Sequence, residues 1–385
     1  MTPQVEFPQI FDRCAGLDVH KDSVVVTVKV NQQSDTTRTF GTFTKDLKEL
    51  AQWLLEMKVT HLAMESTGVY WKPVFNILED NFHVILVNAR HIKYVPGHKT
   101  DVLDSAWIAK LLSSGLLKGS FIPPQEIREM RDLQRLKKKA VGERISVRNR
   151  LHKVLEDANI KLGSVVSDVF GVTGWGIICA LISGETRPEE LIKLAKGSLK
   201  KKAIELADSL ECRLTNHHKF LLEFHKQQLE QIQHNIDLLD RQLEAYLQAH
   251  TTQVELLETI PGVSHETVKG IVAETGFDMS VFPSAQHLAS WAGVCPGNNE
   301  SAGKKKSSRV THGNKALKTA LVEAAWSATH MKNGWLKDKY YAIAARRGKR
   351  RALIAVAHKI LNAVYQVLTN AVPYQEPIAF ATKRN

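Results

Sequence analysis

Short apolar runs alternate with amphipathic stretches over residues 14–122, and this alternation is typical of an α/β domain. A period of two predicts strands, and a spacing of three or four predicts helices. The strands are expected at residues 14–19, 23–30, 37–43, 61–65 and 83–88. The helices are expected at residues 44–57, 69–79 and 101–114. The first domain, residues 1–122, therefore has three strands in series, followed by alternating helices and strands.

After Pro123 and Pro124 the chain becomes strongly helical and charged, which marks a second region at residues 123–253. One amphipathic helix is expected over residues 133–158, and a second over residues 219–249 has coiled-coil heptads. The two core positions are occupied by Leu222, Leu229, Ile236 and Leu243, and by His225, Ile232, Leu239 and Tyr246. Such helices pair, either within one chain as a hairpin or between chains. The glycine-containing stretch 162–202 predicts a small helical insert between them.

The third region, residues 254–385, opens with Ile260-Pro261-Gly262-Val263 between two helical patterns. This is a helix-hairpin-helix signature, a tight turn whose following helix offers backbone N–H groups to a phosphate. A plain packed turn fits so short a motif equally well. A glycine- and asparagine-rich loop follows at residues 290–306, and helices are expected from about residue 314 to about residue 369. The C-terminal domain is therefore expected to be mainly α-helical.

Positive charge is concentrated in this third region. The chain has a formal net charge of +12, and residues 304–351 contain fourteen Lys and Arg against only Glu323 and Asp338. Localised positive charge is typical of proteins that bind nucleic acid, because neutralising phosphates releases counterions. The alternative is a basic helix face that is merely solvated.

The cysteines indicate a reducing environment. The four cysteines lie far apart with no CxxC pair, so neither a zinc site nor a disulfide framework is indicated. The best apolar run, residues 169–183, is shorter than the roughly 20 residues of a membrane span. The N-terminal residues lack the basic and apolar regions of an export signal. We therefore expect a soluble cytoplasmic protein, associated with the nucleoid.

Four carboxylates fall at one end of the predicted α/β domain. Asp18 ends the first strand, Glu65 ends the fourth, and Asp101 and Asp104 open a helix three residues apart. Phosphodiester chemistry uses such clusters because their hard oxygen atoms hold Mg²⁺ ions, which stabilise the attacking and leaving oxygens. Each carboxylate alone has a plainer explanation, as a helix cap or a solvent-facing strand end. Together they occupy the places that an RNase H-like nuclease requires.

Four segments of the chain carry a family resemblance. They are Gly16-Leu17-Asp18-Val19-His20-Lys21, Met64-Glu65-Ser66-Thr67-Gly68-Val69-Tyr70, Lys99-Thr100-Asp101-Val102-Leu103-Asp104-Ser105 and Pro296-Gly297-Asn298-Asn299-Glu300-Ser301-Ala302-Gly303-Lys304. Together they resemble the DEDD transposases, also called bridge recombinases, of insertion-sequence family one hundred and ten. The similarity runs from near residue 14 to near residue 370. It implies an RNase H-like domain resembling Holliday-junction resolvases, a coiled-coil linker and a C-terminal transposase domain.

The resemblance also implies roles for particular residues. Asp18, Glu65, Asp101 and Asp104 would form a tetrad that binds Mg²⁺ or Mn²⁺, and Ser301 would be the nucleophile. The flanking Gly297 and Gly303 would let that loop approach a phosphate closely, although Ser307 or Ser308 could serve instead. The residues placed to hold the nucleic-acid backbone are Lys304, Lys305, Lys306 and Arg309.

The partners that the resemblance implies are donor and target DNA and a structured noncoding guide RNA, the bridge RNA. Further copies of the chain are also expected, as a dimer or tetramer, because recombination must hold two duplexes and the heptads are long enough to pair. The insert at residues 162–202 is larger than the family pattern, which leaves its role open.

Three other classes of protein are alternatives to a recombinase. A resolvase-type endonuclease, in which water attacks, accounts for the carboxylates but not for Ser301. A non-enzymatic nucleic-acid-binding protein accounts for the charge but makes the carboxylates coincidental. An actin-like sugar kinase shares the Gly-x-Asp strand beginning, but a second phosphate-binding glycine turn of that kind is absent from the sequence.

Overall fold

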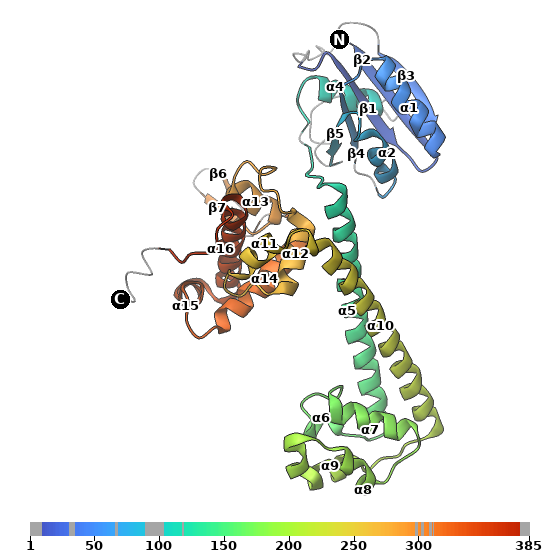
Figure 1. Cartoon of the computed structure of the whole chain (residues 1–385), viewed down its shortest axis with the longest axis vertical. Coiled ribbons are helices and arrows are strands. Elements are labelled where there is room, and N and C mark those ends of the chain that lie inside the picture. Colours follow the sequence, from blue (N-terminus) through green and yellow to red (C-terminus); the bar gives the residue numbers. More distant parts are fainter. Residues whose placement is uncertain are drawn as a thin grey trace. The chain divides into compact units, whose positions relative to one another are not determined.

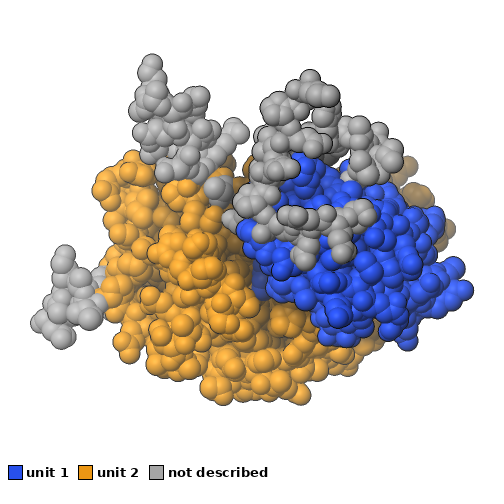
Figure 2. Space-filling view, turned by 90° about the horizontal axis from the view of Figure 1, so that it is seen from above, with its two compact units in different colours: residues 1–122 blue, residues 123–385 orange. Residues whose placement is uncertain are grey.

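The computed structural model describes residues 10–30, 35–65, 68–88, 104–117, 119–296, 299–301, 304–307, 310 and 312–377. The chain divides into two compact units, residues 1–122 and residues 123–385, which are coloured separately in Figure 2. The first unit contains the sheet and the second is built almost entirely of helices (Figure 1). An α/β part followed by a helical part agrees with the fold class expected from the sequence.

The described residues of the first unit form a mixed sheet of five strands in the order β3-β2-β1-β4-β5. The strands β1, β2 and β3 form an antiparallel meander, and β4 and β5 extend it in parallel with β1. Their bounds are β1 (Arg13–Val19), β2 (Ser23–Val30), β3 (Thr36–Gly41), β4 (His61–Glu65) and β5 (His83–Val87). All five predicted strands are present, and their ends differ from the prediction by at most two residues.

Helices cover both faces of this sheet because successive side chains of a strand point to opposite faces. In β1, Ala15 and Leu17 belong to the core cluster that α1 (Thr44–Glu56) and α2 (Trp71–Leu78) cover. Cys14 belongs to the smaller cluster under α4 (Asp104–Ser113). Both faces of the central strand are therefore buried, as expected for a strand that reads as a nearly continuous apolar run.

Gly16 allows α4 to lie directly on β1. A Cβ atom at Gly16 would lie 2.2 Å from the carbonyl oxygen of Ser105 and 2.3 Å from the backbone nitrogen of Ala109. The hydroxyl of Ser105 is also 2.8 Å from the hydroxyl of Thr27, which is buried in β2. The glycine and this hydrogen bond together hold α4 against the sheet.

We predict that Gly16→Ala destabilises the first unit by about 1–3 kcal/mol, because the obstacles are backbone atoms of α4 that cannot rotate away. Thermal or denaturant unfolding measures the loss. The matched control is Gly142→Ala in the second unit, where the new Cβ would meet nothing within 4 Å. An alanine at this helical position should be stabilising by about 0.5–1 kcal/mol. Equal stability of Gly16→Ala and the parent protein would contradict the packing described here.

Two long helices of the second unit, α5 (Gln125–Asp157) and α10 (Asn216–Gln248), pair along their length; we call them the arm (Figure 1). They are antiparallel, because Tyr246 donates a hydrogen bond to Glu129 at 2.7 Å while His218 lies 3.0 Å from Asp157 at the other end. Of the two pairing modes left open by the heptads, the structure has the hairpin within one chain.

The predicted heptad core is used within this hairpin. One core position is buried throughout, at Leu222, Leu229, Ile236 and Leu243, and the second is half-buried. The side chains at the buried position are therefore already covered within one chain, where α10 packs against α5. They are no longer an argument for an interface between chains. Oligomerisation stays an expectation that rests on the resemblance.

The insert between the arm helices is a small helical subdomain, as the glycine-containing stretch predicts. It contains α6 (Leu162–Val165), α7 (Val172–Ile182), α8 (Pro188–Leu191), η1 (Ile192–Leu194), η2 (Gly197–Lys202) and α9 (Ala203–Ser209). Its apolar side chains form one cluster with Val147 and Leu151 of α5 and with Leu222 and Leu229 of α10. The far end of the arm and the insert thus share a core.

The rest of the second unit, which we call the C-terminal bundle, contains six helices and a short β-hairpin among its described residues. Its elements are α11 (Thr251–Glu258), α12 (His265–Thr275), α13 (Ala285–Ala292), β6 (Asn299–Ser301), β7 (Lys304–Ser307), α14 (Lys315–His330), α15 (Trp335–Arg347) and α16 (Lys349–Asn370). By length and composition α16 could span a membrane. In the structure it packs against α11, α13, α14 and α15.

Buried charges join the bundle to the arm. Lys269 of α12 is 3% exposed, and its ammonium lies 2.9 Å from Asp240 and 2.6 Å from Glu244, both on α10. Burial lowers the pKa of Lys269, but hydrogen bonds to Glu244, Glu266 and Asp240 outweigh it and raise the pKa above its usual range. The lysine therefore stays charged, and it holds α12 against the arm.

Candidate active site

Three of the four predicted carboxylates lie at one edge of the sheet. Asp18 and Glu65 occupy the carboxyl ends of the parallel strands β1 and β4, one position beyond the paired residues Leu17 and Met64. Asp18 lies two positions after Gly16 in β1, and Glu65 lies two positions after Ala63 in β4. Gly16 and Ala63 are on the face of the sheet that α4 covers. Both side chains therefore point to the α4 face of the sheet. Asp104 is the first residue of α4, next to the Ser105 backbone that crosses Gly16.

The electrostatics of Asp18 reflect this convergence. Burial raises the pKa of its carboxyl above the usual range, and the charges of Asp104 and Glu65 raise it further, while His20 lowers it. Only side chains that lie near one another affect a pKa in this way. We call Asp18, Glu65 and Asp104 the acidic edge.

The sequence analysis did not single out His20 as a site residue. Its Nε2 atom lies 2.9 Å from Oδ2 of Asp18, and the side chain of Asp18 is 26% exposed. His20 comes directly after the end of β1, two positions beyond Asp18, and this spacing could have identified the pair. The contact with His20 lowers the pKa of Asp18, against the larger effect of burial.

The acidic edge supplies suitable donors for a divalent cation, since Mg²⁺ and Mn²⁺ prefer carboxylate oxygens. Among the described residues, no three His, Cys, Asp or Glu side chains lie close enough together to hold a metal ion. Asp101, the fourth member of the predicted tetrad, lies outside the described residues. Burial is the largest cause of the raised pKa of Asp18, and the charges of Asp104 and Glu65 add to it, so a bound cation would offset the part that comes from these charges.

Ser301 lies in the second unit, in a β-hairpin rather than in the loop predicted from the sequence. It is the last residue of β6 and pairs with Lys304, the first residue of β7. Glu300 pairs with Lys305, so the predicted phosphate-binding lysines follow directly on the opposite strand. Arg309 lies outside the described residues. The backbone thus carries Ser301 at the tip of a two-stranded hairpin.

The two ends of the segment that carries this hairpin are held together. Gly293 ends α13 in the left-handed region, with a φ of 71°. A Cβ atom at Gly313 would lie 2.3 Å from the backbone nitrogen of Gly293, so only glycine permits this approach. A bridge between Pro296 and Val310 closes the base further.

A buried carboxylate fixes the end of this segment. Glu274 of α12 is 2% exposed and accepts a bidentate pair from Arg135 of the arm, at 2.8 and 2.9 Å. It also accepts a hydrogen bond at 2.6 Å from the side-chain amide of Asn314. The side-chain oxygen of Asn314 caps α14 by accepting from the backbone N–H of Ala316 and Leu317. The arm, α12 and the base of the serine hairpin are thereby one connected unit, which sequence periodicity could not reveal.

We predict that Asn314→Asp lowers the free energy of unfolding by about 1–3 kcal/mol and reduces recombination, because a second carboxylate would face buried Glu274. Aspartate still caps a helix, so the loss would come from the contact with Glu274. The matched control is Ser284→Asp, the same kind of cap replacement at α13. Denaturant unfolding and a recombination assay compare the two variants. Losses of equal size in both would show that capping, not the Glu274 contact, is responsible.

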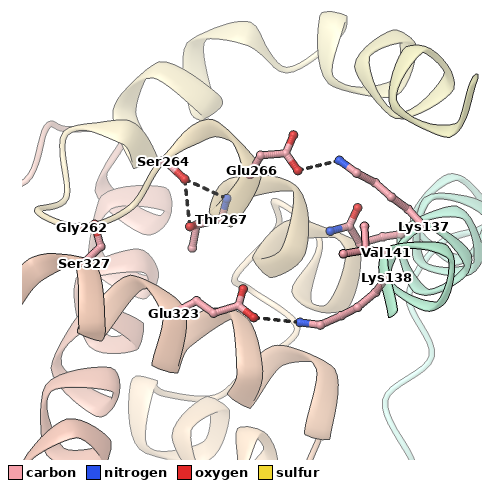
Figure 3. Close-up of a pocket in the computed structure, with 10 residues that line it drawn as sticks. Lys137, Lys138, Val141, Gly262, Ser264, Glu266, Thr267, Glu323 and Ser327 are labelled. Atoms are coloured by element: carbon pink, nitrogen blue, oxygen red, sulfur yellow. Dashed lines mark hydrogen bonds and ion pairs between the residues drawn. The ribbon is translucent and has the colours of Figure 1, made fainter. Parts of the chain in front are cut away.

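The helix-hairpin-helix turn packs within the bundle. A Cβ atom at Gly262 would lie 2.3 Å from the carbonyl oxygen of Ala324, so the turn lies tightly on α14. The adjoining pocket, lined by both arm and bundle residues, is shown in Figure 3. Its charges balance, because Lys137 pairs with Glu266 at 2.6 Å and Lys138 pairs with Glu323 at 3.2 Å. This balance does not favour a phosphate, and packing explains the glycine of this turn.

The acidic edge of one unit and the basic helical second unit are features of enzymes that process nucleic acids. Residues 15–160 match a family described as Transposase, and residues 254–341 match the Transposase IS116/IS110/IS902 family. The transposase for insertion sequence element IS1111A of Coxiella burnetii (strain RSA 493 / Nine Mile phase I) is 24% identical over 330 residues. This match covers 83% of this chain and 80% of the relative.

Two further relatives match shorter segments. The pilin gene-inverting protein of Moraxella bovis is 32% identical over 130 residues, which are 33% of this chain and 40% of that protein. The insertion element IS110 uncharacterized 43.6 kDa protein of Streptomyces coelicolor (strain ATCC BAA-471 / A3(2) / M145) is 29% identical over 140 residues, which are 36% of this chain and 34% of that protein. The chain belongs to the IS110 family of transposases, and it is therefore a DNA-processing enzyme of a mobile element.

Proposed function

We propose that this transposase cuts and rejoins DNA with an acidic tetrad and a serine nucleophile. The tetrad would be Asp18, Glu65, Asp101 and Asp104, and the nucleophile would be Ser301. The observation that carries the proposal is the convergence of Asp18, Glu65 and Asp104 on one sheet edge, where burial and the neighbouring charges raise the pKa of Asp18. The strand order of the sheet supports an RNase H-like assignment of this domain.

The tetrad would hold Mg²⁺ or Mn²⁺, which neutralises charge developing on the phosphate as it is transferred. His20 would keep Asp18 oriented through its hydrogen bond. The rigid base of the serine hairpin would hold Ser301 in place for attack, since positioned groups react faster than mobile ones. The tetrad belongs to the first unit and Ser301 to the second, so under this proposal cleavage would depend on both units.

Lys304, Lys305 and Lys306 of β7, followed by Arg309, would bind the DNA backbone beside Ser301. We further propose that a noncoding bridge RNA pairs with donor and target DNA, and that the working form is a dimer or tetramer on the nucleic acid. The support for these two partners is the family membership.

A strand-joining gel assay with Mg²⁺, donor DNA, target DNA and the element's noncoding RNA tests the proposal. The intact protein should join strands, whereas Ser301→Ala should not. Cleavage without joining by the intact protein would favour the resolvase-type endonuclease, in which water is the attacking group. Binding without any strand breakage would favour a non-enzymatic nucleic-acid-binding protein.

A further inference from the structure

The turn between α15 and α16 holds a dense group of positive charges that the proposed site does not use. Residues 346–351 read Arg-Arg-Gly-Lys-Arg-Arg, and we call them the basic turn. Arg346, Arg347, Lys349 and Arg350 are all exposed. The turn lies beyond residue 341, where the match to the second transposase family ends.

No carboxylate is available nearby in the sequence, because neither Asp nor Glu occurs between Asp338 and Glu376. Within the part of the chain that the structure describes, Arg346, Arg347, Lys349 and Arg350 form no ion pair. Their charges therefore repel one another without local compensation. A solvated surface of a folded protein ordinarily mixes both signs of charge.

The placement of these charges also opposes the stability of α16. Two of them, Lys349 and Arg350, occupy the first turn, where the helix dipole favours acidic residues, and no acidic residue is present there. Gly348 precedes α16 without a side-chain cap. Residues that break a local stability rule without compensation are expected at functional surfaces.

Gly348 leaves the centre of the turn open. Its φ is 83°, which favours glycine, and a Cβ atom built there would meet nothing within 4 Å. The basic side chains thus flank backbone that a large partner could approach. A polyanion would relieve both the mutual repulsion and the unfavourable interaction with the helix dipole.

We propose that the basic turn is a binding surface for the phosphate backbone of duplex DNA, separate from the lysines of β7. Guanidinium groups match phosphate geometry by donating two parallel hydrogen bonds. Single-stranded nucleic acid is ordinarily held by aromatic side chains that stack on its bases, and the basic turn contains none. The surface should therefore bind DNA without regard to sequence. This proposal rests on the proposed function only in taking DNA as the partner.

The test is the salt dependence of binding by the full-length protein, measured by fluorescence anisotropy with short duplexes of unrelated sequence and no divalent metal. Combined Arg346→Gln, Arg347→Gln, Lys349→Gln and Arg350→Gln should weaken binding at least about tenfold. The slope of log affinity against log salt should fall by about 0.9 for each phosphate that the variant no longer neutralises. The melting temperature should stay equal or rise, because like charges are removed from a helix N-terminus.

The matched control removes the same charge from the insert, as Lys196→Gln, Lys200→Gln, Lys201→Gln and Lys202→Gln, which are also exposed. It should keep nearly the parental slope. An unchanged slope in the basic-turn variant, an equal loss in the control, or a larger loss of single-stranded RNA binding than of duplex DNA binding in the basic-turn variant would overturn the proposal. The assay contains no divalent metal and measures binding rather than strand cleavage, so its result can be interpreted even if the catalytic proposal fails.

Discussion

Asp18→Asn is expected to abolish recombination while raising the melting temperature of the metal-free protein. The two effects have one cause, because the folded state places this carboxylate in a partly buried position near Asp104 and Glu65. A carboxyl whose folded pKa is raised binds its proton more tightly in the folded state. Its contribution to stability is therefore lost as the pH rises through its titration, and at neutral pH the charge is destabilising. The neutral amide removes that charge.

Thermal unfolding with and without Mg²⁺ measures the first effect, and the strand-joining assay measures the second. The parent protein should gain stability from the metal by linkage, and Asp18→Asn should gain less. Recombination should fall on the order of 10³-fold or more, as when preorganised charge stabilisation is removed from an active site. The same loss is expected for Glu65→Gln, Asp101→Asn and Asp104→Asn.

Asp80→Asn is the matched control, because Asp80 is exposed just before β5, toward the amino ends of the parallel strands. It should keep parental activity and show a normal response to metal. Full activity in all four tetrad variants, together with no stabilisation by Mg²⁺ or Mn²⁺, would remove the metal site from the proposal.

The strands of the first unit could be predicted from the sequence because each is short and bounded by turn residues, and because all but β3 are largely apolar. The alternation in β1 also fixes the face of Asp18, since Cys14 and Gly16 lie under α4 while Ala15 and Leu17 lie under α1 and α2. The pattern could not show why residue 16 is glycine. A glycine in a strand has many explanations, and only the position of α4 identifies this one as a close approach.

Features that depend on contacts distant in the sequence could not be predicted. Heptads in α10 predict that the helix pairs, but the same heptads would serve a hairpin or a dimer. Glu274 belongs to an amphipathic helix and looks like a surface residue, yet it is buried by Arg135 and Asn314. The glycine-rich stretch around Ser301 predicted a loop, because strands as short as β6 and β7 have too few residues to show alternation.

Ser301→Ala is expected to retain DNA binding and to yield no protein-linked DNA. A recombinase that rejoins ends without an external energy source benefits from conserving the energy of the broken phosphodiester bond. In the proposed reaction, attack by the serine oxygen on the phosphorus would form a phosphoserine ester as the bond to the leaving deoxyribose oxygen breaks, and that oxygen would take up a proton. The hydroxyl of the incoming strand would then reverse the exchange and release the serine. Water in place of serine would leave a hydrolysed end that cannot rejoin.

Suicide substrates that trap the covalent intermediate, followed by peptide mass spectrometry, measure this directly. The adduct should map to the peptide containing Ser301, and strand joining by Ser301→Ala should fall on the order of 10³-fold or more, as expected when a nucleophile is removed. Ser307→Ala is the matched control, because Ser307 ends the opposite strand of the same hairpin. It should form the adduct normally. DNA attached to Ser307 or Ser308, or cleavage with no attached DNA at all, would exclude Ser301 as the nucleophile. The acidic edge is tested separately, by the stabilisation that Mg²⁺ gives in thermal unfolding.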